Sequence, residues 1–128
     1  MPNSAIFDWF SDLSPAFAAR ECWHDGSYHR QVSCQVTYRS DAPFAIACGA
    51  ALLVEHIRRF RFSPDVIQRL GQVSDAQGRS AFDESFLNHL QRMRLQVNLW
   101  APPEGTLLLP GEPLLIARGP EDQIRLLR

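Results

Sequence analysis

The last third of the chain, residues 82–128, decides the fold class and reads FDESFLNHLQRMRLQVNLWAPPEGTLLLPGEPLLIARGPEDQIRLLR. Phe86, Leu87, Leu90 and Met93 recur at the three- and four-residue spacing of an amphipathic helix. Three apolar segments follow, and the Pro/Gly-rich sequences PPEG and PGE separate them. Apolar segments separated by such turn-forming residues are typical of strands joined by turns. The pattern predicts a helix followed by strands at about 95–100, 106–109 and 114–117.

The rest of the chain predicts further helices and one more strand. Gly119 and Pro120 are followed by two acids, which predicts a last helix that begins with proline and runs for about two turns. Upstream, Ser14-Pro15 and Ser63-Pro64 are typical of helix starts, and we expect these helices to end near Gly26 and Gly71. Residues 31–39 alternate apolar and polar, as a strand buried on one face does. After Pro43 we predict a helix that continues through residue 59. The fold class is α+β.

Length and composition indicate one compact domain, residues 1–128. The chain is 45% hydrophobic and 21% charged, with a formal net charge of −1. Such a balance creates no field that would attract nucleic acid or an anionic membrane, so we expect neither partner. No apolar run is long enough to span a membrane, and Asp8 and Asp12 lie where a signal peptide would need an apolar core. We expect a cytoplasmic protein whose three cysteines, Cys22, Cys34 and Cys48, are reduced thiols.

Five blocks in the same order resemble the N-terminal domain of the nicotinate phosphoribosyltransferase family. They are DLSPAFAARECWHDG at 12–26, the segment 36–62 that closes with Phe-Arg-Phe, FDESFLNHL, PEGTLLLPGEPLL, and the Gly-Pro that opens the last helix. The resemblance implies an α/β sandwich of the hammerhead type, as in type II phosphoribosyltransferases, followed in the family by a catalytic barrel. It also implies transfer of phosphoribose from phosphoribosyl pyrophosphate to nicotinate in NAD salvage, coupled to ATP hydrolysis.

The resemblance also implies a dimer and a small set of binding residues. In the family, the N-terminal domain of one subunit completes the pocket of the other subunit's barrel. Arg39 occupies the position of an arginine that reaches a phosphate, a role that suits a guanidinium fork. Ser14 occupies the position of a tyrosine that stacks on the pyridine ring, which a hydroxymethyl group cannot do. Trp9 or Trp23 could take over the stacking, and Trp23, on the opening helix, is our preferred substitute.

Each candidate residue also has a structural interpretation. Arg39 could be a solvated residue at a strand edge. The arginines around Phe60 fit a helix end better than a nucleic-acid stripe, given the charge balance. His56 and His89 each stand alone, without a carboxylate arranged as a catalytic partner. One group resembles a zinc site in residue type, but its spacing is not that of a paired ligand motif, so we expect no metal: Cys22, His24, His29 and Cys34.

No catalytic residue and no cofactor site is predicted within this domain; ATP and phosphoribosyl pyrophosphate would be used by the intact family enzyme. The first hypothesis is a domain that is inert alone and completes the active site of a barrel in the same or a second chain. The alternative is a noncatalytic interaction module, or a degenerate remnant, that docks on a barrel-bearing partner. We expect exposed apolar area on the strands of residues 106–117 or on the last helix, and hence homo-oligomers.

Overall fold

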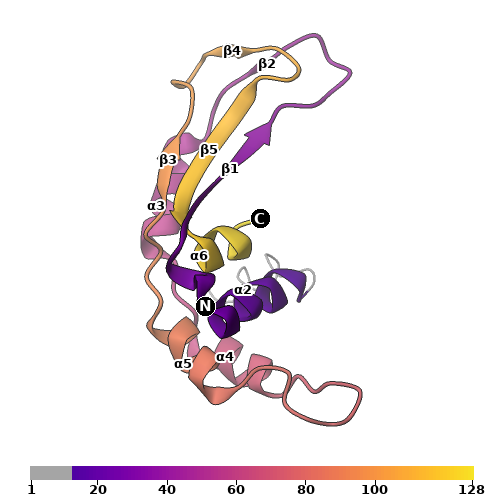
Figure 1. The fold of residues 1–128 in the computed structure, drawn as a ribbon. Coiled ribbons are helices and arrows are strands. Elements are labelled where there is room, and N and C mark those ends of the chain that lie inside the picture. Colours follow the sequence, from indigo (N-terminus) through magenta and orange to yellow (C-terminus); the bar gives the residue numbers. More distant parts are fainter. Residues whose placement is uncertain (1–12) are drawn as a thin grey trace.

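The computed structural model describes residues 13–128. Asp8, Trp9 and Asp12 lie outside the described residues. Figure 1 shows an elongated molecule with helices at one end and strands at the other. We call residues 13–30, 60–94 and 121–128 the base, and residues 31–59 and 95–120 the arm. The elements are α2 (Ser14–Asp25), η1 (Ser27–His29), β1 (Gln31–Thr37), β2 (Ala45–Ile46), α3 (Ala50–Arg59), α4 (Pro64–Gly71), α5 (Glu84–Arg92), β3 (Asn98–Trp100), β4 (Leu107–Leu108), β5 (Pro113–Pro120) and α6 (Glu121–Leu126).

The base contains the hydrophobic core. Phe86 and Leu90, on the inward face of α5, are completely buried, as the apolar spacing predicted. Ala16 and Ala19 of α2 are also buried, and their short side chains let neighbouring elements approach closely. The cluster is completed by residues from α4, from the segments on either side of it and from α6. Burial of this apolar area is the main favourable term in the folding of the base.

The arm is built on an antiparallel sheet with the strand order β1-β5-β3. Gln31 pairs with Pro120 and Val36 with Leu115, and an irregularity follows between Val36 and Thr37. A second pair, β2 with β4, lies at the far end of the arm (Figure 1). Gly119 is required where β5 passes the segment before β3, because a Cβ there would come within 3.0 Å of the Gln96 carbonyl oxygen.

The start of α4 lies where the sequence predicts it, and the opening helix begins one residue earlier than predicted. Ser63 caps α4 by accepting a hydrogen bond from the backbone N–H of Val66 at 3.4 Å, and α4 continues through Gly71. The opening helix α2 begins at Ser14 itself, so the residue at its N-cap is Leu13. Gly26 ends α2 in the left-handed region, with φ of 78°, a conformation that glycine adopts without a steric penalty.

The prediction of one helix from Pro43 to residue 59 is wrong. Residues 45–46 form β2, and α3 begins only at Ala50. The backbone of Ala47 exchanges hydrogen bonds with the segment before β4, donating to the Thr106 carbonyl and accepting from the Gly105 N–H, both at 2.8 Å. The Glu104 carboxylate then accepts from the N–H groups of Gly49 and Ala50 and caps α3. This pairing partner lies more than fifty residues away, so the local pattern could not reveal it.

The last two elements differ from their predicted extents. The strand β5 runs through Pro120, three residues beyond its predicted end. The last helix, α6, is not exposed, because Ile124 and Leu126 are both buried. It packs against α2 and against the base end of the sheet. The expected exposed apolar area therefore lies on the strands and not on the last helix.

Candidate functional site

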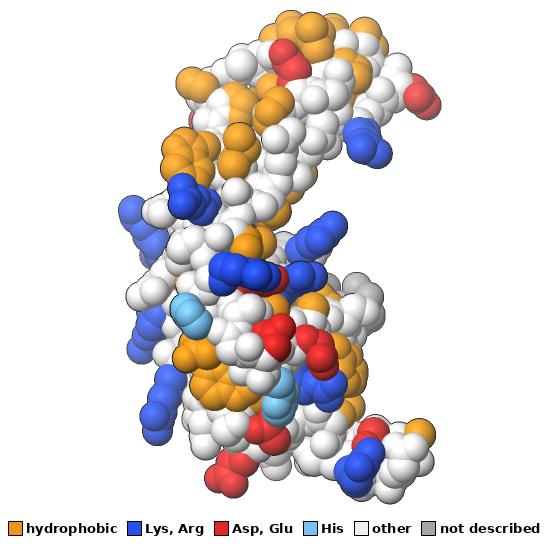
Figure 2. All heavy atoms as spheres, viewed as in Figure 1, with side chains coloured by type: hydrophobic (Ala, Val, Ile, Leu, Met, Phe, Trp, Pro, Cys, Tyr) orange, Lys and Arg blue, Asp and Glu red, His pale blue; other side chains and the backbone are white. Residues whose placement is uncertain are grey.

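Apolar side chains gather on the outer part of the arm. The exposed fraction of Leu107 is 53% and that of Leu109 is 50%, which confirms the expected exposure on the strands of residues 106–117. Figure 2 shows this apolar surface over the end of the molecule that carries β2 and β4. All large apolar residues of this kind among residues 13–128 belong to the arm: Val36, Phe44, Ile46, Leu52, Trp100, Leu107, Leu109 and Leu114. An apolar patch rimmed by polar residues marks a candidate contact surface.

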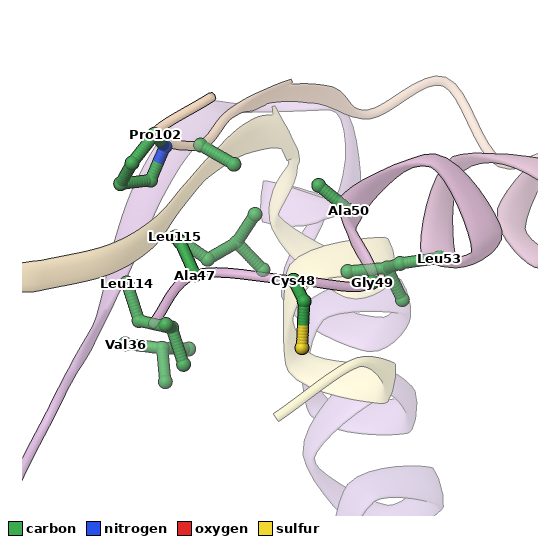
Figure 3. A pocket seen from close by; sticks show the side chains of 10 residues that line it. Val36, Ala47, Cys48, Gly49, Ala50, Leu53, Pro102, Leu114 and Leu115 are labelled. Carbon is green, nitrogen blue, oxygen red and sulfur yellow. The ribbon is translucent and has the colours of Figure 1, made fainter. Parts of the chain in front are cut away.

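A hollow of about 150 Å³ lies between the sheet and the start of α3. Figure 3 shows its lining and the Cys48 sulfur pointing into it. Val36 and Leu115, which are paired across β1 and β5, lie on one side, and Leu53 of α3 lies on the other. Most of this surface is apolar, so it offers contact area without groups that would orient a polar substrate.

Arg39 lies on the exposed loop between β1 and β2. The residue before it is fixed by two backbone hydrogen bonds, because Tyr38 donates to the Glu112 carbonyl at 3.0 Å and accepts from Gly111 at 2.9 Å. The Tyr38 hydroxyl lies 3.5 Å from the Phe44 carbonyl oxygen and bridges the ends of the loop. Arg39 is exposed, and Tyr38 at the start of its loop is held by the turn before β5. Such a position suits contact with an anion from outside the domain.

Ser14 and Trp23 both belong to α2, at its start and near its end. Ser14 is exposed, whereas Trp23 is half-buried. The indole stacks on the His89 ring with centroids 4.3 Å apart, packs against Tyr28 at 4.8 Å and donates to the Ser85 hydroxyl at 3.1 Å. Helix α2 lies in the base, while the loop with Arg39 lies at the far end of the arm (Figure 1). The predicted binding residues are therefore not brought together within this domain.

His89 does have a carboxylate partner, contrary to the sequence-based expectation. Its Nε2 lies 2.6 Å from Oδ2 of Asp122, the second residue of α6, and only 1% of Asp122 is exposed. The second carboxylate oxygen of Asp122 accepts from the backbone N–H of Gln123 at 2.8 Å. Trp23 stacks on the His89 ring. Because His89 belongs to α5 and Asp122 to α6, the pair joins these two helices in the base. His56, in contrast, is exposed on α3.

The residues on either side of Asp122, Glu121 and Gln123, are also buried, and their side chains form hydrogen bonds with distant residues. Glu121 accepts from Arg30 at 2.6 Å and from Arg125 at 3.0 Å. These hydrogen bonds, Arg125 first, hold the pKa of the Glu121 carboxyl below its ordinary value. The Gln123 side chain accepts from the Gln96 N–H at 2.6 Å and donates to the Arg94 carbonyl at 3.0 Å. We call Glu121, Asp122 and Gln123 the polar turn of α6; the turn connects the base to the sheet.

The cysteine and histidine group does not form a metal centre. Across residues 13–128, no three His, Cys, Asp or Glu side chains are placed to hold an ion. All three cysteines carry free thiols. Burial raises the pKa of the Cys22 thiol, which would disfavour the thiolate that a metal requires. No helix in the described part of the chain is long and apolar enough to cross a membrane.

Comparison with known proteins identifies the family. The model of the nicotinate phosphoribosyltransferase (NAPRTase) N-terminal domain matches residues 11–127. The chain belongs to this family. Among curated relatives, the chain is 30% identical over 107 residues to nicotinate phosphoribosyltransferase pncB2 of Mycobacterium tuberculosis, an alignment that covers 81% of this chain. It is 31% identical over 121 residues to the nicotinate phosphoribosyltransferases of Bos taurus and Homo sapiens, which covers 91% of this chain.

The fold is also that of a solved family member. The structure matches the crystal structure of human nicotinic acid phosphoribosyltransferase with a TM-score of 0.78 and 30% identity. The match covers 91% of this chain and 23% of the human chain, which confirms the predicted mixed fold of helices and sheet. The chain spans about 22% of the length of the curated relatives. Family membership thus applies to an N-terminal domain, with the rest of the relatives' length outside the match.

The sequence did not predict that the polar turn of α6 is buried and hydrogen-bonded to distant residues. Two acids at a helix start are usually interpreted as favourable charges at the positive end of the helix dipole, a role compatible with exposure. The only available signal was the stretch of three polar residues between Pro120 and Ile124, and it did not predict burial. Their partners, Arg30 and His89, are separated from them by 91 and 33 residues.

Proposed function

We propose that this chain acts as the N-terminal domain of a nicotinate phosphoribosyltransferase-like protein in cytoplasmic NAD salvage. In this role it completes the pocket of a barrel domain, in the same chain or in a second one, for phosphoribosyl transfer to nicotinate. The observation that supports the proposal is the match of residues 11–127 to the family's N-terminal domain. The relatives' remaining length leaves room for the barrel.

Arg39 is the residue proposed to contact a phosphate of phosphoribosyl pyrophosphate. Arg39 is exposed, and Tyr38 at the start of its loop is tied to the turn before β5 and, through its hydroxyl, to Phe44 at the other end. A charged fork on a fixed loop loses little freedom when it binds an anion, which supports both affinity and orientation. For the pyridine ring we propose Trp23, through the part of the indole that His89 and Tyr28 leave uncovered. Ser14 can contribute only a hydroxyl group.

The domain alone is expected to be inert. Attack of the pyridine nitrogen on the sugar requires groups that stabilise the developing charge and hold both reactants in line. The hollow beside α3 is lined mainly by apolar side chains, and Arg39 and Trp23 lie in different parts of the molecule. Arg39 and Trp23 of one copy are too far apart to contact the same small substrate, which is the reason to propose a site that another protein surface completes.

A noncatalytic interaction module is the second candidate. It is favoured by the concentration of exposed apolar side chains on the arm, including Phe44, Ile46 and Leu107. Such a surface can dock on a barrel-bearing partner, or on a second copy of the chain, without any role in chemistry. In this interpretation, Arg39 is a solvated residue and its removal leaves any activity of the partner unchanged.

The deciding experiment is a calorimetric titration of the purified chain with phosphoribosyl pyrophosphate and nicotinate. It is performed on the chain alone and on a mixture with a family enzyme whose own N-terminal domain has been deleted. The composite-site proposal expects binding or turnover only in the mixture, and a loss of about tenfold or more in Arg39→Ala. The matched control is Arg92→Ala, which removes an exposed arginine from the base.

Each outcome has a distinct meaning. If turnover in the mixture is equal for the wild type, Arg39→Ala and Arg92→Ala, the domain acts only as a structural partner of the barrel. The proposed phosphate contact of Arg39 is then rejected. Complex formation without turnover, measured by sedimentation, would favour the interaction module. A mixture with neither complex nor turnover, although circular dichroism shows both components folded, would contradict the proposal.

A further inference from the structure

The strand β1 forms an edge of the sheet, because β5 is its only neighbour in the order β1-β5-β3. Glu121 donates a backbone hydrogen bond to the Arg30 carbonyl at 2.9 Å, so the backbone groups of Arg30 point towards β5. The direction of these groups alternates along a strand. The groups of residues 32, 34 and 36 therefore also point towards β5, and those of residues 31, 33 and 35 point away. No strand within residues 13–128 pairs with these outward groups.

The edge at β1 lacks the features that usually protect a sheet edge from pairing with another chain. Charged residues, proline, bulges and covering elements give this protection. The sequence of β1, QVSCQVT, contains no charged residue and no proline, its irregularity comes only after Val36, and α6 packs only against the base end of the sheet. The opposite edge differs, because β3 has three residues and α3 lies beside it, with a hollow between α3 and residues 95–99. Figure 1 shows β1 on the side of the sheet away from α3, so β1 is the edge open to a further strand.

The residue pattern of β1 is the same in both directions from its centre, Cys34. The residues two positions away on either side are both valine, and the residues one and three positions away are uncharged and polar: Gln31, Ser33, Gln35 and Thr37. Two identical strands that pair antiparallel are related by a two-fold axis, so a residue before the centre opposes a residue equally far after it. With Cys34 at the centre, valine opposes valine and polar residues oppose polar residues. The strand is therefore complementary to a second copy of itself.

We propose that β1 pairs antiparallel with β1 of a second copy of this chain, with Cys34 opposite Cys34. The outward backbone groups of residues 31, 33 and 35 then form hydrogen bonds between the copies, and the two three-stranded sheets become one continuous sheet. Val36, which is 46% exposed, packs beside Val32 of the second copy. The two-fold axis uses both open edges, so association stops at a dimer. This contact differs from the contact with a barrel that the family resemblance implies, and it does not depend on the proposed transferase role.

The first test places charges at the proposed interface and measures dimerisation of the full chain by sedimentation equilibrium at low salt. Ser33 opposes Gln35 of the second copy, and both side chains are exposed, so substitutions there should leave the fold intact. The double variant Ser33→Lys/Gln35→Lys sets lysine against lysine at two places and should raise the dimer Kd about tenfold or more. Ser33→Lys/Gln35→Glu sets opposite charges together and should restore dimerisation. The matched control, Gln72→Lys/Gln77→Lys, adds the same charge to exposed positions of the base and should leave the Kd unchanged.

The second test checks the register through Cys34. Directly opposed residues outside the hydrogen-bonded pairs have Cα atoms about 4.5 Å apart, which a disulfide can bridge. In Cys48→Ser, which removes the exposed cysteine, oxidised glutathione should convert the dimer into a disulfide-linked dimer, detected by electrophoresis without reductant. The matched control is Cys34→Ser/Cys48→Ser, which retains only the buried Cys22 and should not cross-link.

Three results would overturn the proposal. The first is a folded wild-type chain that stays monomeric at every concentration. The second is equal dimerisation of Ser33→Lys/Gln35→Lys and Ser33→Lys/Gln35→Glu; a dimer that instead dissociates in Leu107→Ser would place the contact on the outer face of the arm. The third is a dimer of Cys48→Ser that oxidised glutathione does not cross-link, which would reject the register centred on Cys34. None of these measurements involves a substrate or a barrel, so their outcome is independent of the proposed function.

Discussion

The base and the arm use apolar residues in opposite ways. The members of the hydrophobic core cluster lie in the base, whereas the large apolar residues that are substantially exposed lie in the arm. The base therefore has its own source of stability. The arm is held by strand pairing and leaves apolar side chains in contact with water. The difference indicates that the base supplies most of the apolar burial that stabilises the fold, while the arm carries the surface on which another protein surface can pack.

The largest expected effect tests the contribution of the core in the base. Phe86 is completely buried within the cluster of α2, α4 and α5. Phe86→Ala should lower the free energy of unfolding by about 3 to 5 kcal/mol, because it removes contacts and leaves a cavity. The measurement is urea unfolding followed by circular dichroism. Trp100→Ala is the control in the arm, where the side chain is 53% exposed and the loss should be small. Equal losses for both variants would contradict the contrast between the two regions.

A smaller effect is expected at the junction between base and arm. Asp122→Ala removes the carboxylate that lies 2.6 Å from His89 and leaves the Gln123 N–H without its acceptor. The free energy of unfolding should fall by about 1 to 3 kcal/mol, the cost of unsatisfied buried polar groups. Asp41→Ala, in the exposed loop after β1, is the matched control and should be nearly neutral. If thermal unfolding of the two variants were the same, the polar turn of α6 would have no stabilising role.

Part of the pH dependence of stability should come from the same junction, and part from the start of α5. Hydrogen bonds from Arg125 and Arg30 hold the pKa of Glu121 below the ordinary value of 4.5, and a hydrogen bond from Ser85 lowers the pKa of Asp83. A carboxyl with a lowered folded-state pKa stabilises the protein above its unfolded-state pKa. That stability is lost as the pH falls through the folded-state pKa. The free energy of unfolding should therefore decrease on acidification below about pH 4.5.

The variant that checks this dependence is Glu121→Gln. It should flatten the acid-side decrease between about pH 5 and pH 3, measured by urea unfolding at each pH. Glu84→Gln, on the exposed first turn of α5, serves as the comparison and should leave the slope near that of the wild type. A slope that Glu84→Gln changes as much as Glu121→Gln would assign the acid sensitivity to general charge and not to the junction.

The smallest effect on stability is expected on the outer face of the arm. Leu107→Ser replaces a side chain that is 53% exposed, so the free energy of unfolding should change by no more than about 0.5 kcal/mol. Self-association, measured by sedimentation at high concentration, should decrease because apolar contact area is removed. Leu108 is the next residue along β4 but only 3% exposed, and Leu108→Ser should cost about 2 kcal/mol or more. Unchanged association in Leu107→Ser would exclude this face as a contact surface.

Local signals predicted the base better than the arm. The serine and proline before α4 and the apolar spacing of α5 correspond to the observed helices, because caps and side-chain periodicity act within a few residues. The segment after Pro43 was predicted as helix and forms β2 instead, because the backbone of Ala47 pairs with residues 105–106. Glu104 then fixes the start of α3 from the same distant loop. Backbone pairing between distant segments leaves no periodic trace in either sequence.

The candidate site was predicted only in part. The positions of Arg39, Ser14 and Trp23 followed from the resemblance to a family, and their binding roles stay predictions. The stacking of Trp23 on His89 and the contact of His89 with Asp122 could not be predicted, because these residues come from three separate helices. The hollow between α3 and residues 95–99 could not be predicted either, since it exists only where α3 lies beside β3.

The sequence by itself determined the mixed class of the fold, the helices with strong local signals and the strands β1, β3, β4 and β5, and its resemblance to a known domain indicated the family. The helices and strands depend on caps, turns and apolar spacing, which act over one or two turns of chain. Only the tertiary structure decided that α6 is buried, that β2 replaces the start of a helix and that the arm exposes its apolar side chains. Each of these depends on which distant segments meet, because burial and hydrogen-bond partners are properties of the packed chain and not of any segment within it.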